Sequence, residues 1–493
     1  MLPFFDELWY NVQTMKKDSL PNRRARAYGM QTSKLSKTEL FEKVSIPRAL
    51  AAMGIPTIIS QLINLVYNIV DALFIGRTGN TYMVAATTVT LTLTMLNVAF
   101  SNLFGVGGGS LIARLMGQRR DEDGRKVSAY SIRGALCLGL GYAAVTGIFV
   151  EPILRFLGAS DATVGFAKQY TLFVIVIGTT PTILALTLAH LLRNTGYSSQ
   201  ASLGLSLGGI LNMALDPLLM FVILPKGQEV TGAALATMIS NVFSCGYLLF
   251  AFRKAARRAP LSLRLGEARG LAKEHKKSLF AVGVPSAVLT GLFDVASVCV
   301  NKLAAAHDDL VLAAFGIVMK VERIPNAVNI GICQGMMPIV AYNYASGNRT
   351  RMQAAVRTAR TYGLIVSGVC IVLLELLARP VTNLFLSTST EDPAKALATI
   401  GFAVAFLRVR CLAAPVQLLN YHTSFSLQAI GNGRYTMLHA CVRELGIYIP
   451  LMYVLDKLFG QMGLAAALPV GEGLAAVFAL WLLHRALRKK SER

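Results

Sequence analysis

Residues 54–76 read GIPTIISQLINLVYNIVDALFIG, a long apolar run that opens on a Gly-Ile-Pro triplet. A second apolar run opens on Gly-Val-Pro at residues 283–285, which is 229 positions later. Two further pairs keep a similar spacing, namely 85–86 with 313–314, which lie 228 apart, and Gly117 with Gly347, which lie 230 apart. A steady offset between two hydrophobic halves is typical of secondary transporters built from internal repeats. The repeat therefore predicts transport, with a substrate site between the halves.

The composition is that of a membrane-spanning chain. Of the 493 residues, 54% are hydrophobic and only 15% are charged, and the charges collect between apolar tracts long enough to cross a bilayer as helices. Twelve such tracts, six in each half, predict an all-α membrane protein with two pseudo-symmetric six-helix lobes and a central cleft. The predicted spans are 50–75, 82–113, 128–150, 165–191, 200–224, 232–252, 279–303, 312–341, 355–377, 398–426, 435–456 and 463–486.

The net charge of +22 would suit a nucleic-acid-binding protein, but its distribution indicates topology instead. Lys and Arg crowd alternate connections, such as residues 119–126, 253–277 and 349–360, while the opposite connections hold one or two each. This is the positive-inside pattern. We therefore expect a multi-pass protein of the cytoplasmic membrane with both termini in the cytoplasm, and no nucleic-acid partner.

The spans divide the chain into five parts. The predicted parts are an N-terminal leader, 1–47, the N-lobe, 48–252, a cytoplasmic linker, 253–278, the C-lobe, 279–486, and a basic tail, 487–493. The leader lacks the continuous apolar region and the cleavage site of a signal peptide. Two interpretations of it stay open: a native start at Met30, or an amphipathic surface segment built on Phe4, Phe5, Leu8, Trp9 and Val12.

Two carboxylates lie inside predicted spans of the N-lobe, where an ionisable group is costly and indicates function. Asp71 follows Tyr67 by one turn in the first span, and Asp216 follows Asn212 by one turn in the fifth. Two polar stripes accompany them at helical spacing: Gln61, Asn64 and Asn68 in the first span, and Thr90, Thr94, Asn97 and Ser101 in the second. Neighbouring stripes of this kind predict a water-accessible cavity.

The two aspartates suit cation coupling. Carboxylates in a low-dielectric pocket can take up a proton on one side of the membrane and release it on the other. The same oxygens, with an Asn carbonyl and a Thr hydroxyl, would also suit Na⁺, so the choice between H⁺ and Na⁺ stays open. Pro217 would add a backbone carbonyl freed within the helix. A purely structural interpretation, in which hydrogen bonds between helices neutralise each Asp, also stays open.

The C-lobe carries charged residues in or near its spans, namely Asp294, Glu322, Glu375, Arg443, Glu444 and Glu472. Asp294 has no cation close to it in sequence, which makes it the best candidate of this group for a place in the cavity. Glu322 is bracketed by Lys320 and Arg323, which predicts a structural ion pair. A shorter polar stripe in the tenth span consists of Gln417, Asn420 and Ser424.

Signatures of other chemistries are missing from the sequence. Residues 105–109 read GVGGG but lack the Lys-Ser/Thr pair of a phosphate loop, so close helix packing explains them better. The seven cysteines fall in or beside apolar tracts without a C-x-x-C motif, which predicts neither disulfides nor zinc. The histidines in the spans are scattered, at 190, 422 and 439. We therefore expect no enzyme, no cofactor and no structural metal.

The sequence resembles the MATE (multidrug and toxic compound extrusion) family over about residues 48–485. Four runs carry the resemblance: IPTIISQLINLVYNIVDALFIG at 55–76, NTGYSSQASLGLSLGGILNMALDP at 194–217, GAALAT at 232–237 and QGMMPIVAYNYASGN at 334–348. The resemblance implies a V-shaped cleft that opens alternately to each side, and drug efflux driven by H⁺ or Na⁺. Asp294 stands about where some relatives carry a Glu in the seventh helix.

The resemblance also assigns roles to residues. The implied cation-coupling residues of the N-lobe are Tyr67, Asp71, Asn212, Asp216 and Thr237, of which the last four would hold Na⁺. The polar stripes and Asp294 themselves, apart from the resemblance, supply the candidates for the substrate cleft: Gln61, Asn64, Asn68, Asn97, Asp294, Gln417 and Asn420. Acidic, aromatic and Met-containing walls suit amphipathic organic cations, which are the expected small-molecule partners. We expect the protein to function as a monomer among membrane lipids.

Two other functions stay open. A flippase for lipid-linked saccharides would share this architecture, but it would favour a cleft rich in Lys and Arg. A membrane-embedded enzyme or scaffold is the more distant alternative, and an enzyme would need a nucleophile and base or a metal-ligand cluster.

Overall fold

The computed structural model describes residues 37–386 and 393–488, and every regular element within these ranges is a helix. The predicted all-α class is therefore confirmed. The amphipathic segment expected in the leader, the alternative start at Met30 and most of the basic tail lie outside the described residues.

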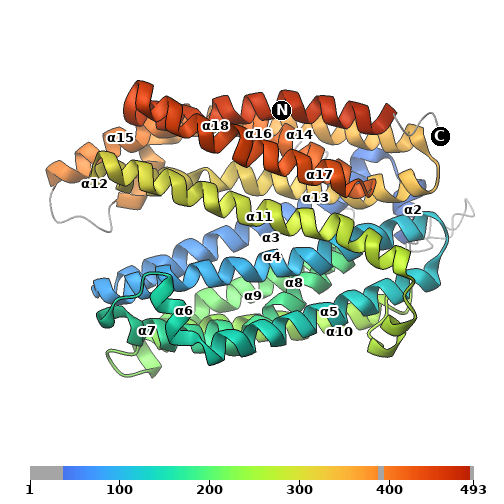
Figure 1. The fold of residues 1–493 in the computed structure, drawn as a ribbon, viewed down its shortest axis with the longest axis horizontal. Helices are drawn as coiled ribbons and strands as arrows, with labels where there is room; N and C mark the ends of the chain where they lie inside the picture. The colour runs from blue at the N-terminus through green and yellow to red at the C-terminus, as the bar shows by residue number, and fades with distance from the viewer. Residues whose placement is uncertain (1–36, 387–392, 489–493) are drawn as a thin grey trace, which may run out of the picture.

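The chain forms two bundles of helices that lie side by side (Figure 1). After a short α2 (Lys37–Glu42), the N-lobe consists of α3 (Ile46–Gly76), α4 (Thr81–Gly117), α5 (Asp121–Ile148), α6 (Val150–Phe156), α7 (Asp161–Thr171), η2 (Leu172–Ile177), α8 (Thr179–Asn194), α9 (Ser198–Leu218), η3 (Leu219–Ile223) and α10 (Glu229–Ala255). The linker contains η4 (Leu265–Gly270). The C-lobe consists of α11 (Lys273–His307), α12 (Asp309–Val321), α13 (Arg323–Ala345), α14 (Arg349–Leu386), α15 (Pro393–Cys411), α16 (Ala414–Ala429), α17 (Gly433–Cys441), η5 (Val442–Tyr448) and α18 (Ile449–Arg488).

All twelve predicted spans fall on these helices, although several spans are broken. Within the described residues, eight helices are long and apolar enough to cross a bilayer, and two bent pairs, at 47° and 48°, raise the number to ten. Two more spans complete the twelve. The continuous stretch of α17, η5 and α18 (Gly433–Arg488), counted once among the eight, contains two spans, because Gly460 (φ 60°, ψ −147°) breaks α18 in a conformation that is essentially restricted to glycine. The last span is α12 with α13, which join at Glu322.

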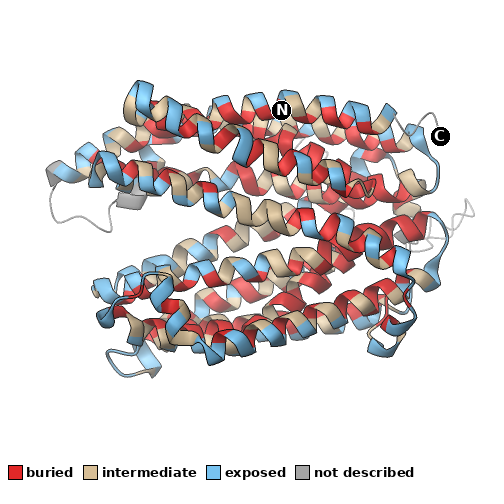
Figure 2. Ribbon diagram, viewed as in Figure 1, coloured by how far each residue is buried: buried red, intermediate tan, exposed pale blue. Residues whose placement is uncertain are grey.

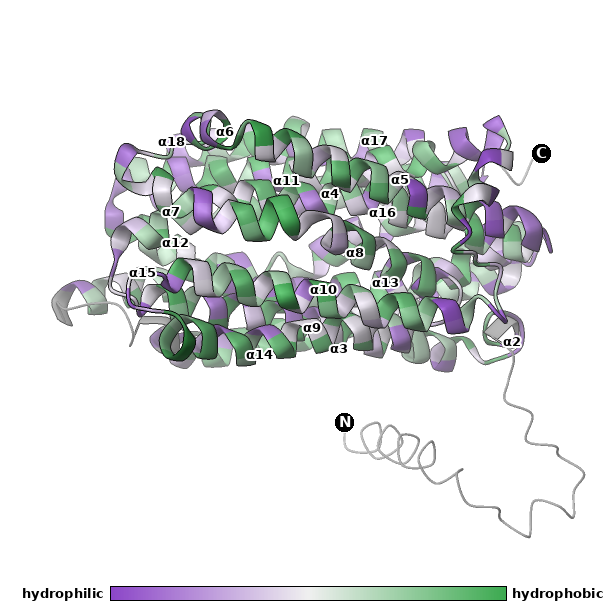
Figure 3. Cartoon of the chain, turned by 90° about the horizontal axis from the view of Figure 1, so that it is seen from below, coloured by the Kyte–Doolittle hydropathy of each residue, from purple (hydrophilic) through white to green (hydrophobic). Residues whose placement is uncertain are grey.

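The outer surface of the bundles is apolar along the middle of the helices and hydrophilic towards their ends (Figure 3). Large hydrophobic side chains are exposed there on both lobes, for example Leu140, Ile148, Phe250, Leu376 and Val477. An exposed apolar belt of this size is expected where the solvent is lipid.

The two lobes are joined at one end only. We call the end that carries the basic connections, residues 118–120 and 256–272, the basic end, and the opposite end the distal end. At the basic end one hydrophobic core crosses both lobes, from α3, α4 and α8 to α11, α13 and α16. Towards the distal end each lobe has its own core, built on α12, α15 and α18 in the C-lobe and on α4, α7 and α10 in the N-lobe. Buried residues accordingly extend across both bundles at the basic end, to the right in Figure 2.

The lobes meet through two equivalent helix pairs, α3 with α13 and α4 with α11. Each pair is closest at the glycine of the triplet that opens its repeat. A Cβ atom on Gly283 would lie 2.0 Å from the carbonyl oxygen of Leu103, and one on Gly335 would lie 2.7 Å from the Cα of Gly54. Backbones approach this closely only where a side chain is missing. The repeated Gly-x-Pro triplets therefore mark the contact between the lobes.

One predicted repeat pair is wrong by two positions. Gly347 follows the end of α13 in the left-handed conformation (φ 81°), and the residue in that conformation after α4 is Arg119 (φ 59°), not Gly117. The corrected offset is 228, which agrees with the neighbouring pairs. An arginine in this conformation costs roughly 1–2 kcal/mol relative to a helical backbone.

The strained arginine belongs to a clamp that connects the lobes at the basic end. Arg119 donates to the Glu42 carboxylate over 2.6 Å, and the Tyr342 hydroxyl of the C-lobe donates to the same oxygen over 2.5 Å. Phe41 is fully buried and stacks on Tyr342 with ring centres 5.4 Å apart. Arg351 adds hydrogen bonds to the backbone oxygens of Phe41 and Val44. The segment before α3 thus holds the basic end closed.

Candidate functional site

The structure brings three of the predicted cation-site residues into one hydrogen-bonded group in the N-lobe. Asn212 and Asp216 lie one turn apart on α9, and Thr237 lies on α10. The Asn212 amide nitrogen donates to Asp216 Oδ1 over 3.2 Å and to Thr237 Oγ1 over 3.3 Å. Asp216 is completely buried and Asn212 is nearly so. One amide group therefore connects the carboxylate to the neighbouring helix.

Asp71 of α3 completes the acidic pair. It lies close enough to Asp216 for the two carboxylates to interact electrostatically. Within the described part of the chain, three buried oxygens of the site have no hydrogen-bond partner: Asp71 Oδ1, Asp216 Oδ2 and Asn212 Oδ1. Buried polar atoms are normally satisfied, so a group of unsatisfied acceptors indicates a place for a donor or a cation.

Packing of small residues positions these side chains. A Cβ atom on Gly209 of α9 would lie only 3.0 Å from the Tyr67 ring, so the glycine makes room for that ring between α3 and α9. Pro217 follows Asp216, and the helix continues as the π-helical turn η3. Proline removes one backbone donor, and π turns are frequent at functional sites. Asp216 therefore lies beside a proline and a π-helical turn that interrupt the regular hydrogen bonding of its helix.

Tyr170 of α7 is a member of the site that sequence analysis missed. Its buried phenol lies near Thr237 and within electrostatic range of Asp71, Asp216 and Tyr67. A tyrosine near the start of an apolar tract carries no signal of its own. Its role follows only from the packing of α7 against α10.

The polar stripes behave differently from one another. On α3, Asn68 is exposed and donates to the Asn64 side chain over 2.9 Å, and Gln61 is partly exposed, so this stripe is accessible. On α4, Asn97 is buried and accepts from Thr179 of α8 over 3.0 Å. Thr90 and Ser101 are buried as well. Because the α4 stripe forms hydrogen bonds to α7 and α8, it faces the interior of the N-lobe. Asn97 therefore does not line an open cleft in this structure.

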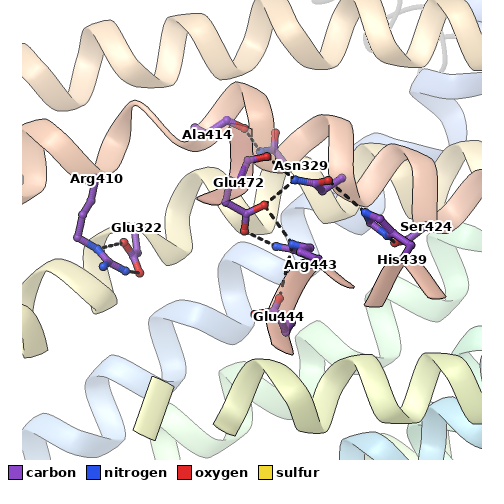
Figure 4. Close-up of polar contacts among 10 residues, drawn as sticks. Glu322, Asn329, Arg410, Ala414, Ser424, His439, Arg443, Glu444 and Glu472 are labelled. Carbon is purple, nitrogen blue, oxygen red and sulfur yellow. Dashed lines mark hydrogen bonds and ion pairs between the residues drawn. The ribbon is translucent and has the colours of Figure 1, made fainter. Parts of the chain in front are cut away.

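The candidate residues of the C-lobe also differ in their exposure. Asp294 is partly exposed on α11 and interacts electrostatically with Arg323, a cation that is distant in sequence. Gln417 and Asn420 are buried within the lobe. The ion pair predicted for Glu322 is present, but its partner is Arg410 of α15, which donates two hydrogen bonds of 2.8 Å (Figure 4). Lys320 and Arg323 are exposed, so they do not compete for a carboxylate that faces the core.

Comparison with known proteins divides this chain into the same two halves as the internal repeat. A model of the MatE family matches residues 56–218 and 285–454, so its two matches begin at the prolines of the repeated triplets. Multidrug export protein MepA of Staphylococcus haemolyticus (strain JCSC1435) is 29% identical over 444 residues, which cover 90% of this chain and 94% of that protein.

Two solved structures have the same fold. One, a MATE in complex with MaL6, has a TM-score of 0.86 at 22% identity and covers 92% of this chain and 100% of its own. The other is the outward-facing conformation of a multidrug resistance MATE family transporter, with a TM-score of 0.84 at 23% identity over 93% of this chain and 100% of its own.

Proposed function

This chain belongs to the MatE family, and on that premise we propose that it is a cation-coupled antiporter. In this proposal it exports amphipathic, mostly cationic organic compounds across the cytoplasmic membrane in exchange for H⁺ or Na⁺. The curated relative is named as a multidrug export protein, which supports export of this kind. The basic connections would lie in the cytoplasm, as the positive-inside rule requires.

The observation that carries the proposal is the acidic pair with its unsatisfied oxygens. Two carboxylates within electrostatic range, with no hydrogen-bond partner on Asp71 Oδ1 or Asp216 Oδ2 among the described residues, need a cation to neutralise them. Proton uptake by the pair would meet this need. Na⁺ among Asp71, Asn212, Asp216 and Thr237 would meet it too, because these side chains supply only oxygen ligands.

One helix connects this site to the contact between the lobes. α3 carries Asp71 towards the distal end and Gly54, which contacts α13, towards the basic end. Neutralising Asp71 would change how α3 packs on α9, and α3 would transmit that change to the α13 contact. Ion and substrate then need only favour opposite arrangements of the two lobes.

The accessible polar residues of α3 and α11 suit a cationic cargo. Gln61, Asn64 and Asn68 on α3 and Asp294 on α11 are at least partly exposed. Their amide oxygens and the Asp294 carboxylate can accept from or attract an organic cation. We propose that substrate binds against these residues, and that the chain works as a carrier without catalysis, cofactor or obligatory partner.

Efflux from proteoliposomes tests the proposal. We would load a fluorescent organic cation and impose a pH gradient or a Na⁺ gradient separately, comparing wild type with Asp71→Asn and Asp216→Asn. Each variant should lower gradient-driven efflux about 5- to 150-fold, the effect of a coupling free energy of ~1–3 kcal/mol. Asp161→Asn is the matched control, because its carboxylate is exposed and pairs with the exposed Arg155. Full efflux by both site variants would refute the coupling role, and no efflux of any cation under either gradient would favour the flippase.

A further inference from the structure

The C-lobe contains a second buried cluster of ionisable side chains, separate from the acidic pair of the N-lobe. Arg443 and Glu444 lie on η5 and Glu472 lies on α18, and all three are at most 4% exposed. Arg443 donates to the two carboxylate oxygens of Glu472 over 3.0 and 2.5 Å. Glu444 also approaches this guanidinium (Figure 4), but only to 3.5 Å, and at the same Nε that already donates to Glu472.

Hydrogen bonds around Glu472 indicate which groups carry protons. The Asn420 amide nitrogen donates to Glu472 Oε2 over 2.6 Å. The Oδ1 atom of Asn420 is therefore left as an acceptor. His439 Nε2 lies 3.1 Å from that oxygen and therefore donates to it. His439 Nδ1 can then accept from the Ser424 hydroxyl at 2.9 Å. The network is thus fully satisfied with a neutral histidine.

The charges of this cluster do not balance. Arg443 and Glu472 form a neutral bidentate pair, and His439 is neutral in the network above. Glu444 adds one negative charge, and its contact is to a guanidinium that Glu472 already neutralises. An unbalanced buried charge costs several kcal/mol even after relaxation. The cluster therefore needs one more positive charge.

Other charged groups near Glu444 do not supply that charge. Among the described residues, the groups that interact electrostatically with Glu444 are Arg443, Glu472 and the phenols of Tyr421 on α16 and Tyr448 on η5. Tyr448 adjoins the Arg410–Glu322 pair, which is itself neutral. On α11, which also packs against η5, Asp294 interacts with Arg323. Both oxygens of Glu472 are already engaged, so Glu444 is the carboxylate that remains available.

We propose that Glu444 binds a second transported proton, in the C-lobe, while the lobes are closed at the basic end. A proton needs one acceptor oxygen, which Glu444 provides, whereas a metal ion needs several. The location supports a role in ion coupling. The cluster lies on the fourth, fifth and sixth spans of the C-lobe repeat. The acidic site of the N-lobe lies on the equivalent three spans of its own repeat, together with the first. This inference rests on the proposed ion-coupled transport and adds a proton to its stoichiometry.

Infrared spectroscopy of the full chain in lipid detects the proton directly. Protonated carboxylic acids have a carbonyl stretch that carboxylates lack, and ¹³C-labelled glutamate shifts that band for Glu but not for Asp. In wild type, a pH titration should show a label-sensitive band that disappears at high pH. Glu444→Gln should remove this band and release one proton fewer per molecule, whereas Glu375→Gln, at a partly exposed glutamate of the same lobe, should retain it.

The outcomes separate this inference from the proposed function. The band should persist in Asp71→Asn/Asp216→Asn, whatever those substitutions do to efflux. Absence of a label-sensitive, titrating band in wild type would overturn the inference even if Glu444→Gln failed to fold. A band that survives Glu444→Gln would overturn it as well, because another glutamate would then hold the proton.

Discussion

Asn212 connects the parts of the N-lobe site, because one amide nitrogen donates both to Asp216 and to Thr237. Sequence spacing was sufficient to select Asn212 and Asp216, since residues one turn apart share a helix face. It could not select Tyr170 or pair Glu322 with Arg410, because those contacts join helices whose relative rotation depends on packing. The same limit explains Asn97, whose stripe has the spacing of a cavity wall but faces its own lobe.

Tyr170 gives the first prediction at this scale. Tyr170→Phe removes a buried hydroxyl near Thr237 and within electrostatic range of both carboxylates, so the site loses a polar interaction worth about 0.5–1.5 kcal/mol. The concentration of coupling ion at half-maximal efflux should rise roughly two- to twelvefold. Tyr142→Phe is the matched control, because that hydroxyl donates over 3.0 Å to the Leu93 backbone oxygen instead. Equal ion dependence in both variants would remove Tyr170 from the site.

The buried ion pair of Arg410 and Glu322 gives the second prediction at the residue scale. Arg410→Met leaves the Glu322 carboxylate without its bidentate partner, and should lower the free energy of unfolding by about 3–5 kcal/mol. Glu322→Leu combined with Arg410→Met should recover most of this loss, because a buried pair can be replaced by apolar side chains at little cost. Unfolding of the detergent-solubilised variants measures both. A double variant as unstable as Arg410→Met would contradict this expectation, because the unpaired Glu322 carboxylate would then not be the source of the loss.

At the scale of the helices, the close glycine contacts explain why the basic end is closed. The existence and approximate extent of all twelve spans followed from hydropathy alone. Their breaks did not, because the π turns η2, η3 and η5 and the turn at Gly460 leave no hydrophobic signature. Two of those irregularities lie beside the ionisable clusters: η3 follows Asp216, and η5 carries Arg443 and Glu444. The helix breaks, which are the hardest features to predict from sequence, thus include two that lie beside the ionisable side chains.

Gly283 provides the prediction for this scale. Gly283→Ala places a Cβ atom 2.0 Å from the Leu103 carbonyl oxygen, so α11 must move away from α4. Overpacking of about 1–3 kcal/mol should shift the population towards molecules open at the basic end roughly 5- to 150-fold. Gly291→Ala on the same helix is the control, because its Cβ would meet nothing within 4 Å. Accessibility of a thiol label at the basic end reports the shift, and equal labelling in both variants would refute the role of this contact.

The whole molecule is a pair of lobes joined by one core at the basic end and separate towards the distal end. This arrangement follows from the repeat, since two copies related by an axis along the membrane normal meet through equivalent helices. The clamp of Glu42, Arg119 and Tyr342 closes the same end. Alternation between the two sides then requires that the acidic pair, through α3, controls whether this end stays closed.

Distances between the lobes, measured by spin labels as a function of pH and Na⁺, test that requirement most directly. One label pair at the repeat-equivalent residues Thr81 and Asp309 reports the distal end, and one at Arg125 and Gln353 reports the basic end. We predict that one of the two ions shifts both distance distributions in opposite directions in wild type and shifts neither in Asp71→Asn/Asp216→Asn. An equal shift in the double variant, or distances that respond to neither ion in wild type, would contradict it.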